Sequence, residues 1–315
     1  MHQAKGESRA KIILIGEHAV VYGQPAIALP IKSIKLQVTV TPTQDHQQKI
    51  RSTFYRGLLA DAQPPFTGLT KLISRLLVFF SAESQGFTLT IESALPAERG
   101  MGSSAACAIA IIRAFYAAFD TSLDRATLLN WAAVSEKAIH GNPSGLDAAT
   151  TSADRPQWFI RGEAPKAIHF PSRGVLVIAD TGEMGQTGAA VGHVADLLRR
   201  DHARFQPLIE SIGLASRKAA VALAQDDLAA LGKQLNTAQA ALSQLGVSAP
   251  ALDRLIQAAA AAGALGAKLT GSGQGGCMIA LAQDSTSAAT IAQALQRAGA
   301  AATWQYDFSE SEAIS

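Results

Sequence analysis

Residues 96–104 read Pro-Ala-Glu-Arg-Gly-Met-Gly-Ser-Ser, and an almost wholly apolar run follows over residues 105–112. This order predicts a glycine-rich loop that leads into the first turn of a buried helix. Glycines let a backbone approach a ligand closely, and a helix start offers unpaired N–H groups and the positive end of the helix dipole. These features favour a phosphate group as the ligand. The alternative for the stretch alone is an ordinary turn with a helix cap.

A second stretch, over residues 11–23, reads Lys-Ile-Ile-Leu-Ile-Gly-Glu-His-Ala-Val-Val-Tyr-Gly. Its first five residues predict a buried strand. An unpaired buried ammonium is costly, so Lys11 in such a strand needs a partner; the alternative is a surface lysine at the strand end. Glu17 and His18 follow at a glycine turn, where polar contact groups are common, and a solvated Glu-His pair is the alternative there.

A helix is predicted over the residues that precede the third stretch. Thr121 or Ser122 would cap it, and it would run to about residue 139. At 3.6 residues per turn, Glu136 falls on the same face as the apolar Leu128. A buried carboxylate must be paired, protonated or bound to a metal. Glu136 is therefore a candidate Mg²⁺ ligand, and a buried salt bridge is the alternative.

The turn Gly-Asn-Pro-Ser-Gly at residues 141–145 ends this helix and leads to Asp147. A hydroxyl nucleophile gains from a nearby carboxylate and a nearby cation. Asp147 is therefore a candidate to face a reacting hydroxyl.

A third glycine-rich stretch, Lys-Leu-Thr-Gly-Ser-Gly-Gln-Gly-Gly-Cys, covers residues 268–277 and precedes a strand-like run at 278–281. Four of the six residues from 271 to 276 are glycine, which is more than a hairpin needs. The stretch is a further candidate for ligand contact, and a flexible turn before a strand is the alternative.

Together these segments resemble the GHMP kinase superfamily, and within it they closely resemble the mevalonate kinase family. The matching residues are 11–23, 96–106, 136–147 and 268–277, which span almost the whole chain in the family's order. Residues 179–187 are also similar to the loop that opens the family's C-terminal domain. Separate multi-residue matches in the right order make chance an unconvincing explanation.

The resemblance implies an α+β, two-domain GHMP kinase fold. Residues 1–170 would form the N-terminal ATP-binding domain, similar to domain 2 of ribosomal protein S5. Residues 171–315 would form a ferredoxin-like C-terminal domain, with the active site in the cleft between the two domains. The implied activity is transfer of the ATP γ-phosphoryl group to the 5-hydroxyl of (R)-mevalonate, in the mevalonate route to isoprenoids.

The resemblance also implies roles for individual residues. Asp147 would be the base at the substrate hydroxyl, and Lys11 would pair with it and stabilise the developing charge. Ser104 and Glu136 would hold Mg²⁺. The residues expected to wrap the ATP phosphates are Glu98, Arg99, Gly100, Met101, Gly102, Ser103 and Ser104. Those expected near substrate are Glu17, His18, Gly271, Ser272 and Gly273.

Two positions depart from the family pattern. Glu98 stands where many relatives have glycine, so the early part of the phosphate loop would contact ATP differently. Gln274 interrupts the third glycine run.

Composition is compatible with an enzyme that acts on small molecules. The chain has 315 residues, 48% of them hydrophobic, and a formal net charge of +2. Its basic residues are scattered, which gives nucleic-acid binding little support. Cys107 and Cys277 lie in apolar settings, which predicts reduced thiols and a cytoplasmic location. We expect no signal peptide from the polar residues 1–7 and no membrane partner, because no uncharged apolar run reaches 18 residues. The sequence leaves open whether the chain forms a homodimer.

Two other functions fit the same residues. One is a different GHMP kinase that acts on phosphomevalonate or a sugar. The other is a non-catalytic ligand sensor on the kinase fold, which loss of Lys11, Glu136 or Asp147 would have favoured; all three are present.

The remaining pattern predicts an order of strands and helices. Alternation of apolar and polar residues predicts half-buried strands at 34–40 and 87–91. A strand is expected at 175–178 and helices at about 187–201 and 226–245. Residues 42–66 are polar and rich in turn residues, and we expect an irregular excursion there.

Overall fold

The computed structural model describes residues 1–63, 66–95, 99–140, 143–171, 173–185 and 187–311. The chain forms two compact units. Unit 1 comprises Met1–Lys11, Ile31–Pro96 and Gly102–Ser152. Unit 2 comprises Ile12–Pro30, Ala97–Met101 and Ala153–Ser315. Each unit mixes helices and strands, as expected for the α+β class.

Unit 1 contains a sheet in the order β4-β3-β5-β2, in which β1 also pairs with β2. The strands are β1 (Ala4–Ile15), β2 (Ala26–Thr43), β3 (Gln48–Arg51), β4 (Arg56–Leu58) and β5 (Gly86–Ser93). β2 and β5 are antiparallel, whereas β3 and β5 are parallel. Ile34, Leu36 and Val38 are buried and alternate with more exposed residues, which confirms the predicted pattern in β2.

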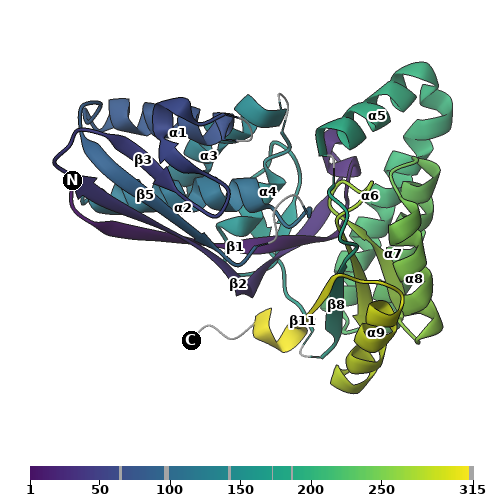
Figure 1. The fold of residues 1–315 in the computed structure, drawn as a ribbon. Coiled ribbons are helices and arrows are strands. Elements are labelled where there is room, and N and C mark those ends of the chain that lie inside the picture. The colour runs from purple at the N-terminus through teal and green to yellow at the C-terminus, as the bar shows by residue number, and fades with distance from the viewer. Residues whose placement is uncertain (64–65, 96–98, 141–142, 172, 186, 312–315) are drawn as a thin grey trace. The chain divides into compact units, whose positions relative to one another are not determined.

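The described residues of unit 1 include four helices, and α1, α2 and α3 lie over one face of its sheet (Figure 1). The helices are α1 (Thr67–Phe79), α2 (Ser103–Ala118), α3 (Arg125–His140) and α4 (Leu146–Thr151), and a 3₁₀ turn, η2, covers Leu59–Asp61. Most of α2 is buried, as the apolar run after the glycine-rich loop predicts.

Two expectations for unit 1 are wrong in detail. The excursion at residues 42–66 contains β3 and β4, because Ile50 is buried and anchors a short strand beside β5. The helix expected to be capped by Thr121 or Ser122 begins at Arg125. Its first turn is capped by Asp124, whose Oδ1 accepts a hydrogen bond from the backbone N–H of Thr127 at 2.8 Å.

Unit 2 contains a four-stranded sheet in the order β11-β8-β10-β9, and each neighbouring pair is antiparallel. The strands are β8 (Val175–Asp180), β9 (Gly266–Thr270), β10 (Cys277–Ala282) and β11 (Ala302–Asp307). Helices connect β8 to β9 and β10 to β11, and a short glycine-rich turn joins β9 to β10. Numbered along the chain, this is the order 4-1-3-2 of a ferredoxin-like β-α-β-β-α-β arrangement, which confirms the expected C-terminal fold.

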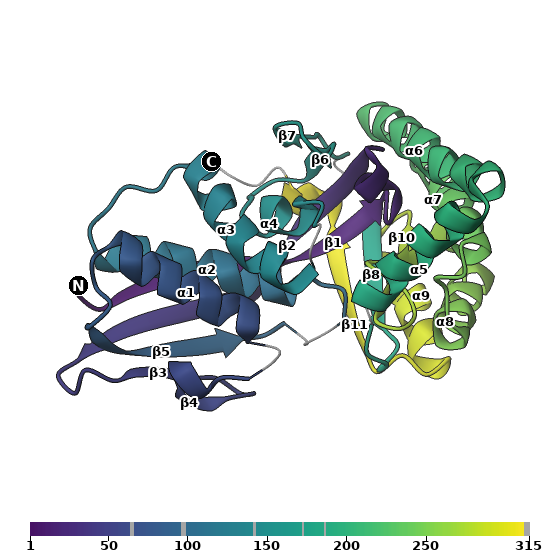
Figure 2. The same ribbon diagram turned by 90° about the horizontal axis from the view of Figure 1, so that it is seen from above.

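The helices of unit 2 are α5 (Thr187–Arg200), α6 (His202–Ala224), α7 (Leu228–Gln244), α8 (Pro250–Ala261) and α9 (Ser285–Arg297). α7, α8 and α9 pack against the four-stranded sheet, α6 packs on α7 and α5 on α6, and residues of all five helices join one apolar core with the sheet (Figure 2). α5 and α7 match the two predicted helices closely. α6 was not expected, because only Asp201 separates it from α5; the Asp201 carboxylate caps α6 through the backbone N–H of Arg204.

The rest of unit 2 consists of short elements. They are β6 (Gln157–Phe159), β7 (Lys166–Ala167), and the 3₁₀ turns η1 (Ala19–Tyr22) and η3 (Phe308–Ser311). β6 pairs with β7 and with Ala26–Ala28 of β2.

Three expectations stay predictions: a domain boundary between residues 170 and 171, a cytoplasmic location and the homodimer. The two compact units place parts of β1 and β2 in each unit, so they do not correspond to two consecutive halves of the chain. In the described part of the chain, no helix is both long enough and apolar enough to cross a membrane.

Gly6 lets β1 lie directly against α2. A Cβ atom at Gly6 would lie 2.1 Å from the carbonyl oxygen of Ala110 and 2.5 Å from the backbone nitrogen of Ala114. Since both neighbours are backbone atoms, no side-chain rotation could relieve the overlap. The Ser8 hydroxyl also donates to the carbonyl of Ala106 at 2.7 Å, which fixes the same strand and helix together.

We predict that Gly6→Ala lowers the free energy of unfolding by about 1–3 kcal/mol or more, the usual cost of overpacking a core. Gly192→Ala is the control, because a Cβ there, within α5, would meet no atom within 4 Å. That substitution should raise stability by about 0.5–1 kcal/mol, the difference in helix propensity. Urea denaturation of both variants measures this. If Gly6→Ala were as stable as the wild type, β1 and α2 would not be in tight contact at this position.

Candidate functional site

A buried lysine and a carboxylate form an ion pair in unit 1. Lys11 on β1 is 2% exposed, and its Nζ lies 2.9 Å from Oδ1 of Asp147. Asp147 is the second residue of α4, and the residue that precedes this helix, Gly145, adopts a left-handed conformation with φ of 85°. The Asp147 side chain is 40% exposed, so one side of this pair is open to solvent. The alternative of a surface lysine at position 11 is wrong.

Glu136 is the second carboxylate of this site. It is only 8% exposed on α3, on the same buried face as Leu128, as predicted. Burial, and secondly the negative charge of Asp147, raise the pKa of Glu136 to about 7, although a hydrogen bond with the backbone of Ala148 and the charge of Lys11 act in the opposite direction. A buried carboxyl group with this pKa would gain a large stabilisation from a bound cation. We call Lys11, Glu136 and Asp147 the Lys11 cluster.

Gly102 lies beside the Lys11 cluster at the start of α2. It has a left-handed φ of 75°, and a Cβ there would lie 2.7 Å from Cγ of Lys11 and 3.2 Å from Cγ2 of Thr151. No side chain caps α2 at Gly102. Ser103 is half-buried and Ser104 is exposed at the first turn. The N-terminus of α2 therefore presents backbone N–H groups and the Ser104 hydroxyl next to the buried lysine.

The earlier part of the glycine-rich loop belongs to unit 2. Glu98 lies outside the described residues, and Met101 is buried. Nε of Arg99 lies 3.2 Å from Oδ2 of Asp180, whose Oδ1 accepts from the backbone N–H of Gly182 at 2.9 Å. Nη1 of Arg99 is buried and has no hydrogen-bond partner among the described residues. An orphaned guanidinium donor fits an anionic group.

Unit 2 contains a second buried ion pair. The Glu17 carboxylate is bonded to the Lys268 ammonium, and both side chains are fully buried. Lys268 also donates to the carbonyl of Leu269. Burial lowers the pKa of Lys268, while the carboxylate of Glu17 acts to raise it. Substrate contact by Glu17 stays a prediction, because the structure shows this carboxylate in an ion pair.

His18 follows Glu17 in a left-handed backbone conformation, and its ring makes a hydrogen bond. Its backbone adopts a left-handed φ of 59°, and its Nε2 lies 2.9 Å from the carbonyl oxygen of Ser272. Burial lowers the pKa of His18 to about 4, so the ring is neutral near pH 7. Because a carbonyl only accepts, Nε2 carries the proton and Nδ1 is left as an acceptor. We call Glu17, His18, Lys268 and Ser272 the Lys268 cluster.

The third glycine-rich stretch joins β9 to β10 and surrounds this cluster. Gly271 and Gly273 have φ of 85° and 77°, and a Cβ at Gly273 would lie 2.0 Å from the carbonyl oxygen of Val247. Gln274, the non-glycine residue in the run, also adopts a left-handed φ of 55°, and its N–H donates to the same carbonyl at 2.8 Å. The stretch is therefore a turn held against Val247, and its role in ligand contact stays a prediction.

Sequence reasoning brought together Lys11, Glu136 and Asp147 correctly. It missed Lys268 as the partner of Glu17 and Asp180 as the partner of Arg99. A signal for the first was present: Lys268 lies between Ala267 and Leu269 in an apolar strand, which by the argument applied to Lys11 requires a partner. Among the described residues, no group of three or more His, Cys, Asp or Glu side chains forms a metal site. Metal binding by Ser104 and Glu136 stays a prediction.

The raised pKa of Glu136 predicts a specific pH dependence of stability. The folded protein binds this proton more tightly than the unfolded chain, so the contribution is fully present below pH 4.5 and is lost as pH rises through about 7. Glu136→Gln cannot titrate. In buffer without divalent cations, wild-type stability minus that of Glu136→Gln should fall by roughly 2–3 kcal/mol between pH 4.5 and pH 8.

The measurement is urea denaturation of both proteins across this pH range. The lowered pKa of His18 affects both proteins alike and cancels in the difference. A difference that does not vary with pH would mean that Glu136 titrates as an ordinary exposed carboxylate.

Known protein families match both parts of the chain. Residues 69–154 match the family described as GHMP kinases N terminal domain, and residues 219–301 match GHMP kinases C terminal. A mevalonate kinase of Thermococcus sibiricus is 33% identical over 312 residues, which cover 92% of this chain and 92% of that protein.

Solved structures are similar over almost the whole chain. The crystal structure of L. major mevalonate kinase in complex with R-mevalonate has a TM-score of 0.82 at 27% identity, and the match covers 96% of this chain and 95% of that one. The Streptococcus pneumoniae phosphomevalonate kinase in complex with phosphomevalonate and AMPPNP has a TM-score of 0.83 at 19% identity, covering 98% and 100% of the two chains. The second likeness concerns the fold alone.

Proposed function

The chain belongs to the GHMP kinase family, and we propose that it transfers the γ-phosphoryl group of ATP to the 5-hydroxyl of (R)-mevalonate, giving 5-phosphomevalonate. The observation that carries the proposal is the Lys11 cluster, in which a buried cation lies 2.9 Å from a carboxylate open to solvent. The identity of 33% over 92% of the chain to a mevalonate kinase supports the choice of acceptor.

Asp147 is the base in this proposal. Its exposed carboxylate accepts the proton of the 5-hydroxyl as the hydroxyl oxygen bonds to the γ-phosphorus and the bond from that phosphorus to the β–γ bridging oxygen breaks, releasing ADP. Lys11 holds Asp147 from the buried side, and its ammonium stabilises the negative charge that develops on the transferred group. Phosphoryl transfer depends mostly on positioning and charge neutralisation, and this pair contributes to both.

ATP and Mg²⁺ fit the residues of the glycine-rich loop. Gly102, Ser103 and the N–H groups that begin α2 bind phosphate, and the orphaned Nη1 of Arg99 is a donor suited to another phosphate oxygen. Gly100 and Met101 complete the loop in this proposal, together with Glu98, which stands where many relatives have glycine.

Ser104 and Glu136 hold the metal in this proposal. A hydroxyl and a carboxylate are hard oxygen ligands of the kind Mg²⁺ prefers, and the high pKa of Glu136 fits a group that awaits a cation. Bound Mg²⁺ supplies charge neutralisation at the phosphate oxygens of ATP.

The Lys268 cluster contributes to acceptor binding in this proposal. His18 offers Nδ1 as a neutral acceptor, and Glu17 acts through its ion pair with Lys268, which fixes the turn that carries His18. Gly271, Ser272 and Gly273 supply backbone and hydroxyl groups near substrate.

Purified protein supplied with ATP and Mg²⁺ tests the choice of acceptor. ADP release should be fastest, as kcat/KM, with mevalonate among a panel of mevalonate, phosphomevalonate, galactose and homoserine. A higher kcat/KM for another alcohol would overturn the mevalonate assignment and leave the kinase assignment intact. No ADP release with any of them would favour the non-catalytic sensor.

Substitutions in the Lys11 cluster test the mechanism. We predict that Asp147→Asn and Lys11→Met each lower kcat by roughly 10²-fold or more, the scale usual for acid–base and charge-stabilising groups, with a much smaller change in ATP affinity. The controls are Asp61→Asn and Lys35→Met, which alter exposed residues outside the cluster. Steady-state kinetics and calorimetric ATP titration measure both quantities. Near-normal turnover of either cluster variant would exclude the role assigned to that residue.

A further inference from the structure

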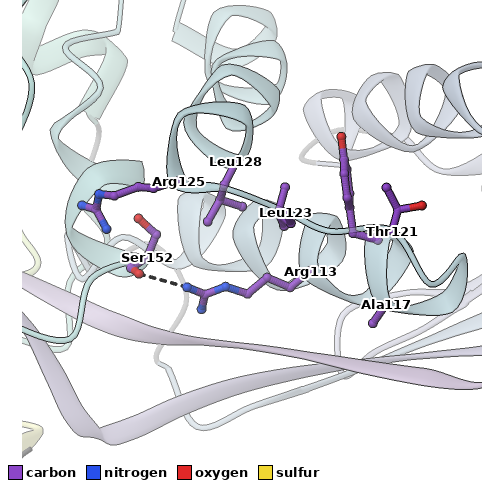
Figure 3. Close-up of a pocket in the computed structure, with 8 residues that line it drawn as sticks. Arg113, Ala117, Thr121, Leu123, Arg125, Leu128 and Ser152 are labelled. Carbon is purple, nitrogen blue, oxygen red and sulfur yellow. Dashed lines mark hydrogen bonds between the residues drawn. The ribbon is translucent and has the colours of Figure 1, made fainter.

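Arg113, on α2, connects the two elements that carry the ion pair of the Lys11 cluster. Its Nη1 donates to the carbonyl oxygen of Glu7 on β1 at 2.6 Å, and its Nη2 donates to the carbonyl oxygen of Ser152 at 2.9 Å. Figure 3 shows the side chain extending from α2 with its guanidinium bonded to Ser152. One planar group therefore joins a strand and the end of a helix that are far apart in the sequence.

The two bonded carbonyls lie close along the chain to the proposed catalytic residues. Glu7 precedes Lys11 by four residues on β1, so the two side chains fall on the same face of the strand. Ser152 directly follows α4, whose first turn carries Asp147. A guanidinium is a rigid fork with fixed donor directions. Its two bonds therefore constrain the spacing between β1 and α4, and with it the approach of Lys11 to Asp147.

α4 depends on contacts of this kind. A six-residue helix is too short to be stable alone, and its last carbonyls have no partners within the helix. Arg113 bonds the carbonyl of Ser152, and Arg125 on α3 bonds the carbonyl of Ala149 at 2.9 Å. Both cations also interact favourably with the negative end of the helix dipole. The end of α4 opposite Asp147 is thus anchored from two helices.

We propose that Arg113 is a positioning residue for phosphoryl transfer, which holds β1 and α4 at the spacing that keeps Lys11 and Asp147 paired. This inference rests on the proposed function. In this proposal Arg113 acts through its hydrogen bonds to the carbonyls of Glu7 and Ser152.

An open cavity beside the guanidinium makes the proposal testable by chemical rescue. Arg113, Arg125, Leu128 and Ser152 are among the residues that line it, and its volume is about 360 Å³. A small guanidinium ion could enter this space after truncation of the Arg113 side chain and bond the two carbonyls again.

The experiment compares wild type, Arg113→Ala and a control, Arg75→Ala, which removes an exposed arginine of α1. We expect Arg113→Ala to lower kcat by roughly 10-fold to 100-fold, because small displacements of catalytic groups have effects of this size, with much smaller changes in KM for either substrate. Methylguanidinium should restore a substantial part of kcat in Arg113→Ala, and methylammonium should not. The control should match wild type throughout.

A second variant covers the case in which Arg113→Ala does not fold. Arg113→Lys retains the charge without the planar fork, and we expect it to lower kcat with little change in thermal stability. The proposal would be overturned if a folded variant had an unchanged kcat. It would also be overturned if activity fell only in proportion to the folded fraction and methylguanidinium did not restore it.

The choice of acceptor separates this result from the proposed function. Each protein is assayed with the alcohol that the wild type phosphorylates fastest. A wild type that prefers another alcohol to mevalonate overturns the assignment of substrate, whereas an unaffected Arg113→Ala overturns only the positioning role.

Discussion

The buried ammonium of Lys11 is the constraint on which the rest of unit 1 depends. An ammonium removed from water is costly unless a partner lies within bonding distance, and Asp147 supplies that partner at 2.9 Å. The pairing requires α4 to begin close to β1, and it requires a residue without a side chain at Gly102, where a Cβ would overlap Lys11. It also places a second carboxylate, Glu136, near the first, and this contributes to the pKa of about 7 at Glu136.

A second buried lysine, Lys268, differs from Lys11 in the exposure of its partner carboxylate, and this difference bears on the roles proposed for the two ion pairs. The side chains of Glu17 and Lys268 are both fully buried, so a ligand could contact either charged group only if the residues that cover them moved. Asp147, by contrast, is 40% exposed, so it can contact a hydroxyl group while Lys11 remains bonded to it. A lysine–carboxylate pair is thus fully enclosed in unit 2, whereas in unit 1 its carboxylate is accessible for the role proposed for Asp147.

The sequence was sufficient to predict the Lys11 cluster, because burial of a charge demands a partner and the motif resemblance named one. It was also sufficient for strands and helices with long, regular periodicity, such as β2, β5 and α7. It was not sufficient for β3 and β4, since a polar segment forms these short strands around one buried residue, Ile50. Nor could it identify α6 after α5, because a single capping residue, Asp201, separates two helices of similar pattern. The pairing of Lys268 with Glu17 depends on contacts between residues 251 positions apart, although the apolar neighbours of Lys268 required some such partner.

Gly102 links the glycine-rich loop to the ion pair of Lys11 and Asp147. A Cβ at this residue would meet both Lys11 and Thr151, and the Thr151 hydroxyl bonds the carbonyl of Asp147 at 2.9 Å. The start of α2 therefore packs on the lysine and, through Thr151, on the helix that carries the base. Since packed interiors transmit displacement rather than absorb it, any movement of the loop at Gly102 displaces Lys11 or α4. The residues proposed to bind phosphate and those proposed to activate the hydroxyl are thus mechanically coupled within unit 1, so that a loop correctly placed for ATP is also a condition for a correctly placed base.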